Sequence, residues 1–181
     1  MIIGVPKEIK NNECRVSLLP VGVESLVRAG HQVIIEHNAG LGSGVNDVDY
    51  ETVGGEIAQT PESIFAQAQM IVKIKEPQPS EHRLLKKDQI VFTYFHFAAS
   101  RELTEAMLER KITALAYETL QTQDGELPCL TPMSEVAGRM AVHEGGQIFG
   151  RADEGQGNSI GRCPGRLPGG SGHYRRRCGG V

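Results

Sequence analysis

Short apolar segments alternate with helical patterns through the first 150 residues, and this alternation constrains the fold more than any other feature of the sequence. We predict strands at about 2–5, 32–36, 70–75, 90–95 and 112–117. Helical patterns lie between and after these strands, at Pro20–Ala29, 61–68, Ser80–Leu85, Ser100–Arg110 and from Met133 to about Phe149. Strands that alternate with helices form mostly parallel sheets with helices on both faces. The pattern therefore predicts an α/β domain.

Composition excludes several classes of protein. The 181 residues suffice for one domain, and 39% hydrophobic with 23% charged residues is typical of a globular chain. A formal net charge of −3 gives no basis for a nucleic-acid or anionic-membrane surface, so we expect a small-molecule partner, no nucleic acid and no membrane. The sequence shows no secretory signal and no apolar run near the ~18 residues of a membrane span. We therefore expect a cytoplasmic protein.

The cysteines give no sign of a metal site or a disulfide framework. They lie far apart without C-x-x-C spacing, at Cys14, Cys129, Cys163 and Cys178. We expect reduced thiols and no bound metal.

Three cationic or titratable residues follow predicted strands, where an α/β sheet places its ligand site. Arg15 follows the first strand, and its guanidinium is suited to hold a carboxylate with two hydrogen bonds, although a surface ion pair is the alternative. Lys75 ends the third strand as a point charge for a carboxylate or carbonyl oxygen. Alternation puts Lys73 on the same face, and one of these two lysines is expected to be exposed to solvent. His96 follows the fourth strand, where an imidazole suits proton transfer in carbonyl chemistry, although a hydrogen-bonded core histidine is the alternative.

Two further segments resemble parts of a nucleotide site. Residues 39–44 carry the spacing G-x-G-x-G, whereas the dinucleotide-binding fingerprint is G-x-G-x-x-G, so we predict a flexible loop there. Ser134 stands at the start of the last predicted helix, whose N-terminus is suited to face a phosphate or ribose. Capping of that helix is the simpler role for Ser134.

Several segments together resemble the N-terminal domain of the alanine dehydrogenase and pyridine-nucleotide transhydrogenase family. They are Ile3–Glu8, Asn12–Val16, Ala39–Gly44, Val72–Pro77, Phe92–Ala99, Ala116–Thr119 and Pro132–Arg139, and the match runs from residue 1 to about 150. The resemblance implies a Rossmann-like substrate domain over residues 1–133, a linking helix over 134–150, and a second, NAD-binding domain that is missing from this chain.

The resemblance also implies an activity, namely NAD-dependent oxidative deamination of L-alanine to pyruvate and ammonium, by a homohexamer in the intact protein. It implies that Arg15 and Lys75 hold the substrate, that His96 is the acid/base, that Met133 lies by the substrate and that Ser134 lies by the nucleotide. The alternatives are the alpha subunit of a proton-translocating NAD(P) transhydrogenase and a non-catalytic fragment. The combination of Lys75 with His96 favours the dehydrogenase branch.

Residues 151–181 have a different composition from the rest of the chain. They hold nine of the 22 glycines and six arginines but no lysine, as in a disordered tail that binds RNA. A shift of the reading frame by one base is the hypothesis we prefer. Codons compatible with Gln156–Gly180 then permit a sequence that resembles the family's domain junction and ends in G-G-G-V-V-G, a dinucleotide fingerprint.

Overall fold

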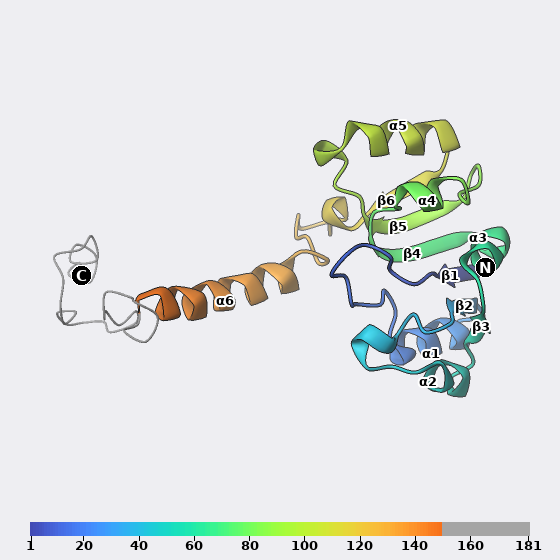
Figure 1. Cartoon of the computed structure of the whole chain (residues 1–181), viewed down its shortest axis with the longest axis horizontal. Helices are drawn as coiled ribbons and strands as arrows, with labels where there is room; N and C mark the ends of the chain where they lie inside the picture. Colours follow the sequence, from blue (N-terminus) through green and yellow to red (C-terminus); the bar gives the residue numbers. More distant parts are fainter. Residues whose placement is uncertain (150–181) are drawn as a thin grey trace. The chain divides into compact units, whose positions relative to one another are not determined.

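Six parallel strands form one sheet in the computed structural model, which describes residues 1–149 (Figure 1). The strands are β1 (Ile2–Val5), β2 (Gln32–Glu36), β3 (Glu56–Ala58), β4 (Met70–Lys75), β5 (Ile90–Tyr94) and β6 (Thr113–Ala116). They lie in the order β3-β2-β1-β4-β5-β6, and each neighbouring pair is parallel. The predicted α/β fold with a mostly parallel sheet is confirmed.

Helices connect these strands and cover both faces of the sheet. In chain order they are α1 (Pro20–Arg28), η1 (Leu41–Ser43), α2 (Asp47–Thr52), α3 (Pro61–Gln67), α4 (Pro79–His82), η2 (Phe97–Ala99), α5 (Arg101–Arg110) and η3 (Tyr117–Thr119), the η elements being 3₁₀ helices. Val33 and Ile35 of β2 belong to one buried cluster, with residues of α1 and α2, whereas Ile34 belongs to another. Because strand side chains alternate between faces, the sheet has a hydrophobic core on each side.

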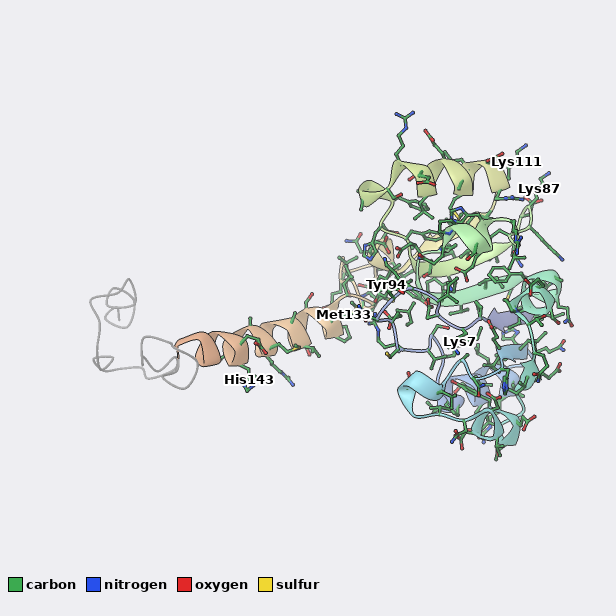
Figure 2. All side chains as sticks on the ribbon, viewed as in Figure 1. Lys7, Lys87, Tyr94, Lys111, Met133 and His143 are labelled. Atoms are coloured by element: carbon green, nitrogen blue, oxygen red, sulfur yellow. The ribbon has the colours of Figure 1, made fainter. Side chains whose placement is uncertain are left out.

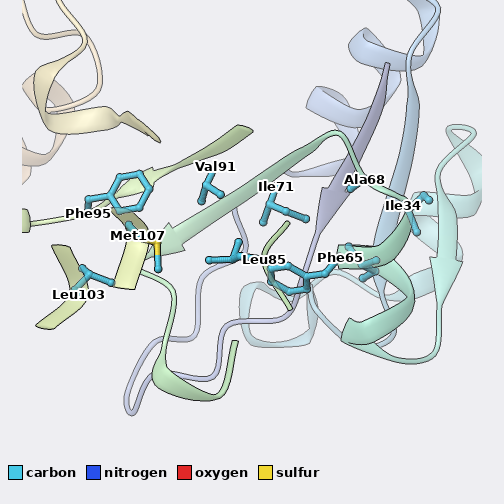
Figure 3. Packing of buried hydrophobic residues seen from close by; sticks show 10 residues of the cluster. Ile34, Phe65, Ala68, Ile71, Leu85, Val91, Phe95, Leu103 and Met107 are labelled. Carbon is cyan, nitrogen blue, oxygen red and sulfur yellow. The ribbon is translucent and has the colours of Figure 1, made fainter. Parts of the chain in front are cut away.

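The larger core joins α3 and α5 to the central strands (Figure 3). Its members include Ile64 and Phe65 of α3, Ile71 of β4, Val91 of β5, and Leu103 and Met107 of α5. Burying each such side chain contributes about 1.5–3 kcal/mol. This core fixes α5, and with it the segment that joins β5 to α5.

The helix boundaries confirm some predictions and correct others. Thr60 Oγ1 accepts a hydrogen bond from the Ser63 N–H at 3.4 Å, and Ser100 Oγ accepts one from the Leu103 N–H at 3.2 Å, so α3 and α5 begin with side-chain caps. The helix predicted at Ser80–Leu85 is instead the four-residue α4, which begins at Pro79 because Gln78 and Glu81 form a capping box. The sequence analysis did not predict α2 and β3.

A second unit begins at Pro128, after a first unit of Met1–Leu127. Its described part contains α6 (Thr131–Phe149), the long helix that the sequence predicted from Met133. The Ser134 N–H donates to the Leu130 carbonyl at 3.0 Å, so Ser134 already lies inside the helix. The prediction that Ser134 caps this helix is wrong, because the helix begins three residues earlier, at Thr131. The Gly/Arg-rich segment 151–181 lies outside the described residues.

No helix within residues 1–149 combines the length and the apolar character needed to cross a membrane.

Gly4 is required where β1 passes beneath α3. A Cβ at this position would lie 2.5 Å from Ile64 Cγ2 and 2.9 Å from Ala68 Cβ. We expect Gly4→Ala to lower the free energy of unfolding by about 1–3 kcal/mol, because two well-packed residues must shift. Urea denaturation followed by circular dichroism measures this change.

Gly22→Ala is the matched control for this prediction. Gly22 lies in α1, and a Cβ there meets only Leu18 Cδ2 at 3.5 Å, an ordinary contact. Alanine favours a helix interior over glycine by about 1 kcal/mol, so this variant is expected to be at least as stable as the unsubstituted chain. Equal destabilisation by both substitutions would contradict the packing argument.

Candidate functional site

The carboxyl ends of β1, β4 and β5 lie at one edge of the sheet, next to the point where the strand order reverses. The chain proceeds from β1 to β2 on one side, whereas β4 pairs with β1 on the other. In open α/β sheets, ligands bind in the crevice outside the strands at such a reversal. The segments that follow these three strands carry Arg15, Lys75 and His96, so the fold places all three predicted residues at this edge.

Arg15 lines a cleft of about 160 Å³ after β1. The cleft is formed by Lys7, Glu8, Glu13, Cys14, Arg15, Asn38, Ala39, Leu41 and Gly42. The Arg15 guanidinium donates from Nε to Glu13 Oε1 at 2.8 Å and from Nη2 to Glu13 Oε2 at 2.6 Å. The ion pair that the sequence left as an alternative is therefore present, and it forms part of a cleft. Half of the Arg15 side chain remains exposed, so further N–H donors face the solvent.

The Glu13–Arg15 pair changes the titration of both groups. Hydrogen bonds from the Arg15 side chain lower the pKa of Glu13 from 4.5 to about 2, although partial burial opposes the shift. The same hydrogen bonds raise the pKa of Arg15. Glu13 thus stays ionised and orients the guanidinium over the whole neutral range.

The glycine-rich segment 39–44 supports the Arg15 segment. The Val16 N–H donates to Ser43 Oγ at 3.1 Å, and a Cβ on Gly42 would lie only 2.3 Å from the Cys14 carbonyl oxygen. Gly42 therefore permits a close approach between the two segments. Residues 41–43 form η1, so the segment predicted as a flexible loop contains a turn of 3₁₀ helix packed beside Arg15.

Lys75 ends β4 at an irregular place in the sheet. The β4–β5 register shifts between Val72 and Lys75, and such bulges redirect side chains next to active sites. The Lys75 side chain is half-buried, and within residues 1–149 its ammonium makes no ion pair shorter than 4.0 Å. Its charge is near enough to help lower the pKa of Glu13. Lys75 therefore lies near the Glu13–Arg15 pair.

Lys73 is not exposed to solvent. Its side chain has 0% exposure, and its ammonium lies 2.8 Å from Glu81 Oε1 and 3.4 Å from Glu8 Oε2. The expectation that one of these two lysines is exposed to solvent is wrong, because Glu8 and Glu81 enclose the Lys73 ammonium and the Lys75 side chain is half-buried. Burial raises the pKa of Glu8, and this shift is opposed by the Lys73 charge and by hydrogen bonds from two backbone N–H groups.

His96 is exposed, with its backbone in the left-handed region at φ 54° and ψ 41°. Histidine adopts this conformation more often than most residues, but it is still strained. The His96 N–H donates to Glu118 Oε1 at 2.7 Å, and the His96 ring stacks on Tyr94 with centroids 6.1 Å apart. The alternative of a buried core histidine is wrong, because the imidazole lies at the surface of the site.

Glu76 and Glu118 are site residues that the sequence analysis did not single out. Each has one buried carboxylate oxygen, Oε2, without a hydrogen-bond partner in the described part of the chain. Burial raises the pKa of Glu76, but a hydrogen bond from Lys10 and the charges of Lys10 and His96 outweigh it, so the net shift is downward. His96 thus lies near an acidic group. The signal in the sequence was the position of Glu76 directly after Lys75.

Met133 and Ser134 lie on α6, in the second unit (Figure 2 labels Met133). Both side chains are exposed within the described structure. Arg15, Lys75 and His96 belong to the first unit, so the roles assigned to Met133 and Ser134 stay predictions.

The described residues do not form a dinucleotide site. The strand order β3-β2-β1-β4-β5-β6 is shared with dinucleotide-binding folds, in which the turn after the first strand is a short glycine-rich phosphate cradle. Here residues 6–19 connect β1 to α1 without a single glycine. In the other glycine-rich segment, 39–44, Gly42 packs directly against the Cys14 carbonyl group. Among residues 1–149 no cluster of three potential metal ligands occurs.

Residues 4–137 match the family model of the alanine dehydrogenase/PNT N-terminal domain. The chain belongs to this family. The alanine dehydrogenase of Methanococcus maripaludis is 52% identical over 168 residues, which cover 93% of this chain and 45% of that protein. The alanine dehydrogenase of Mycolicibacterium smegmatis is 45% identical with the same coverage. The chain thus spans about half the length of the curated relatives it matches. An alignment of 168 residues also extends past residue 150, farther than the sequence analysis expected.

Solved structures of the family support the same assignment. An L-alanine dehydrogenase superposes with a TM-score of 0.81 at 48% identity, over 87% of this chain and 44% of that one. A transhydrogenase from Sinorhizobium meliloti superposes with a TM-score of 0.62 at 28% identity, over 65% of this chain and 35% of that one. Within the alanine dehydrogenase/PNT family, this chain is therefore more similar to the dehydrogenase than to the transhydrogenase.

Removing the Glu13 carboxylate is expected to change how stability depends on pH. A carboxyl whose pKa falls from 4.5 to about 2 on folding stabilises the fold above pH 4.5, and this contribution is lost as the pH falls towards 2. The difference in the free energy of unfolding between the unsubstituted chain and Glu13→Gln should therefore shrink over that interval. Urea denaturation at a series of pH values measures it. Arg15→Ala should show the same loss, and a difference that stays constant with pH would count against the Glu13–Arg15 pair.

Glu118 is expected to hold the His96 backbone. Glu118→Ala removes the acceptor of the His96 N–H and should cost about 1 kcal/mol of stability, with faster hydrogen exchange of the His96 amide. Glu118→Gln keeps an acceptor oxygen and serves as the control. Exchange measured by NMR decides the matter, since an equally protected His96 amide in Glu118→Ala would show that the hydrogen bond is dispensable.

Proposed function

We propose that this chain is the substrate-binding part of an NAD-dependent alanine dehydrogenase, which interconverts L-alanine with pyruvate and ammonium. The observation that carries the proposal is the juxtaposition of Arg15, Lys75 and His96 at the carboxyl edge of the sheet, in a chain whose relatives are named alanine dehydrogenases. Two cations suit an α-carboxylate and its neighbouring oxygen, and an imidazole suits the proton transfers at the adjacent carbon.

Arg15 and Lys75 would bind and orient the substrate. Glu13 uses the Nε and Nη2 donors of Arg15, so the remaining guanidinium N–H groups are available for the substrate carboxylate. Lys75 adds a point charge for the carboxylate or carbonyl oxygen, from a half-buried position in which a charge interaction is less screened than in water.

His96 would hold or release the proton that the substrate nitrogen or oxygen exchanges. Its ring is exposed at the site, stacked on Tyr94, and its backbone is fixed by Glu118. NAD would accept the hydride, and because the described residues offer no dinucleotide cradle, its binding is assigned to other parts of the intact protein. Met133 beside the substrate and Ser134 beside the nucleotide complete this proposal, on the strength of the family resemblance.

The proposal includes the homohexamer and the cytoplasmic setting that the resemblance implies. The higher identity to L-alanine dehydrogenase favours the dehydrogenase over the transhydrogenase alpha subunit. A non-catalytic fragment is the remaining alternative. The hypothesis that a one-base shift of the reading frame produced residues 151–181 remains part of this proposal.

Pyruvate binding to the 181-residue chain tests the proposed function. We expect pyruvate to shift the NMR signals of residues around Arg15, Lys75 and His96, and we expect Arg15→Ala or Lys75→Ala to weaken binding about tenfold or more, because each removes a charge-assisted contact. Lys87→Ala is the control, since Lys87 lies beyond the amino end of β5, far from Lys7 and Tyr94 (Figure 2).

Two results bear on the alternatives. Absence of any pyruvate-dependent shift at these residues would contradict the proposed substrate site. We also expect the chain alone to produce no NADH from L-alanine and NAD, because it lacks a dinucleotide cradle among the described residues. Measurable NADH production by the purified chain would show that this assignment of NAD binding is wrong.

A further inference from the structure

The end of β4 lacks a strand partner on the side that faces β1. The β1–β4 ladder pairs Ile3 with Met70 and Gly4 with Ile71, and β4 then continues to Lys75 without β1. On the other side, the register with β5 shifts between Val72 and Lys75. Buried backbone N–H groups need acceptors, so something other than a strand must satisfy those at the end of β4.

The Glu8 carboxylate supplies the missing acceptor. Glu8 Oε1 accepts hydrogen bonds from the Ile74 N–H at 2.6 Å and the Lys75 N–H at 3.4 Å. The Glu8 side chain is only 4% exposed, so these bonds are protected from water. A side chain from the segment after β1 thus fixes the backbone that carries Lys75.

Lys73 and Glu81 in turn hold Glu8. The second Glu8 oxygen, Oε2, lies 3.4 Å from the buried Lys73 ammonium, which lies 2.8 Å from Glu81 Oε1. Glu81 Oε2 accepts the Gln78 N–H at the start of α4 at 2.7 Å. Glu81, Lys73 and Glu8 therefore form one continuous polar network from the start of α4 to the end of β4, in which each of these buried charges has a partner.

We propose that Glu8 is a positioning residue, which sets the place of the Lys75 ammonium through the backbone of β4 and is itself held by Lys73 and Glu81. Glu8 acts through the two amide groups and needs no contact with the substrate. The inference rests on the proposed function of Lys75 in binding a carboxylate substrate. The length of the Glu8 side chain matters as well, because an aspartate is one methylene shorter and would not reach both the Lys73 ammonium and the two amides.

Glu8→Gln tests this role, with Glu36→Gln as the matched control. Glutamine presents an amide NH₂ to the Lys73 ammonium, so it cannot keep both sets of contacts. Glu36, the last residue of β2, is also a half-buried carboxylate. It accepts the Lys7 N–H at 2.8 Å and makes no bond to the β4 backbone. The two variants therefore remove similar groups with different backbone partners.

The first measurement is the acetylation rate of each lysine in the folded 181-residue chain, followed by mass spectrometry. We expect Glu8→Gln to raise the Lys75 rate by about threefold or more, the effect of a lost network contact, while Lys87 and Lys111 are unchanged. Glu36→Gln should leave the Lys75 rate as it is. An unchanged Lys75 rate in Glu8→Gln, or an equal change in both variants, would overturn the proposal.

Glu8→Asp provides a second route if circular dichroism shows that Glu8→Gln does not fold. The aspartate keeps a negative charge near Lys73 but withdraws from the Ile74 and Lys75 amides. The same rise in Lys75 acetylation supports the positioning role, and its absence overturns it.

Pyruvate affinity separates this inference from the proposed function. If both are correct, Glu8→Gln weakens pyruvate binding about tenfold, whereas Lys87→Ala, the control used for the proposed function, does not. If the unsubstituted chain binds no pyruvate, the proposed function fails, while the acetylation rates still decide whether Glu8 positions Lys75. If pyruvate binds equally well to both variants while Lys75 reactivity changes, Lys75 is positioned by Glu8 but does not carry the substrate.

Discussion

A fully buried lysine ammonium ties together the three segments that surround the site. Moving a charge out of water is costly unless oppositely charged groups surround it, so Lys73 requires both Glu8 and Glu81 in place. Glu8 belongs to the segment after β1, Lys73 to β4, and Glu81 to α4. Displacing any of these segments would leave a buried charge without its partner. Arg15 and Lys75 lie on two of these segments, so the same contacts restrict their backbone.

The sheet has the strand order of a dinucleotide-binding fold but a different connection at its switch point. The strand order is that of a dinucleotide-binding fold, but the connection after β1 contains cationic and acidic residues in place of glycines. A glycine-rich turn brings a helix N-terminus against a pyrophosphate, whereas a longer polar connection forms a cleft lined by side chains. Ligand choice thus depends on the loops at the switch point, and the strand order alone does not determine it.

The sequence predicted the main strands and the helices α1, α3 and α5 because each carries a continuous apolar run or a clear capping residue. It failed for β3 and α2, which are too short for a periodic pattern, with three and six residues. It also placed the start of α6 too late, since Ser134 has the side chain of a cap while the helix in fact begins at Thr131. Local patterns decide the elements, but they place helix ends less well.

The residues of the candidate site were also predictable only in part. Arg15, Lys75 and His96 were predictable because each follows an apolar strand, and topology brings strand ends together. The environment of Lys73 was not predictable, because alternation treats Lys73 and Lys75 alike and says nothing of acidic residues from the segment after β1 and from α4. The anchoring of His96 by Glu118 was equally hidden, since the two residues meet only when β5 and β6 pair.

The strand order has a consequence for how the sheet can assemble while the chain is being synthesised. β1 is made first and lies in the centre, β2 and then β3 extend the sheet on one side, and β4, β5 and β6 then extend it on the other. Each strand that emerges from the ribosome therefore finds its neighbour already present. Parallel sheets fold slowly because their strands pair over long loops, but here no pairing has to wait for a later segment.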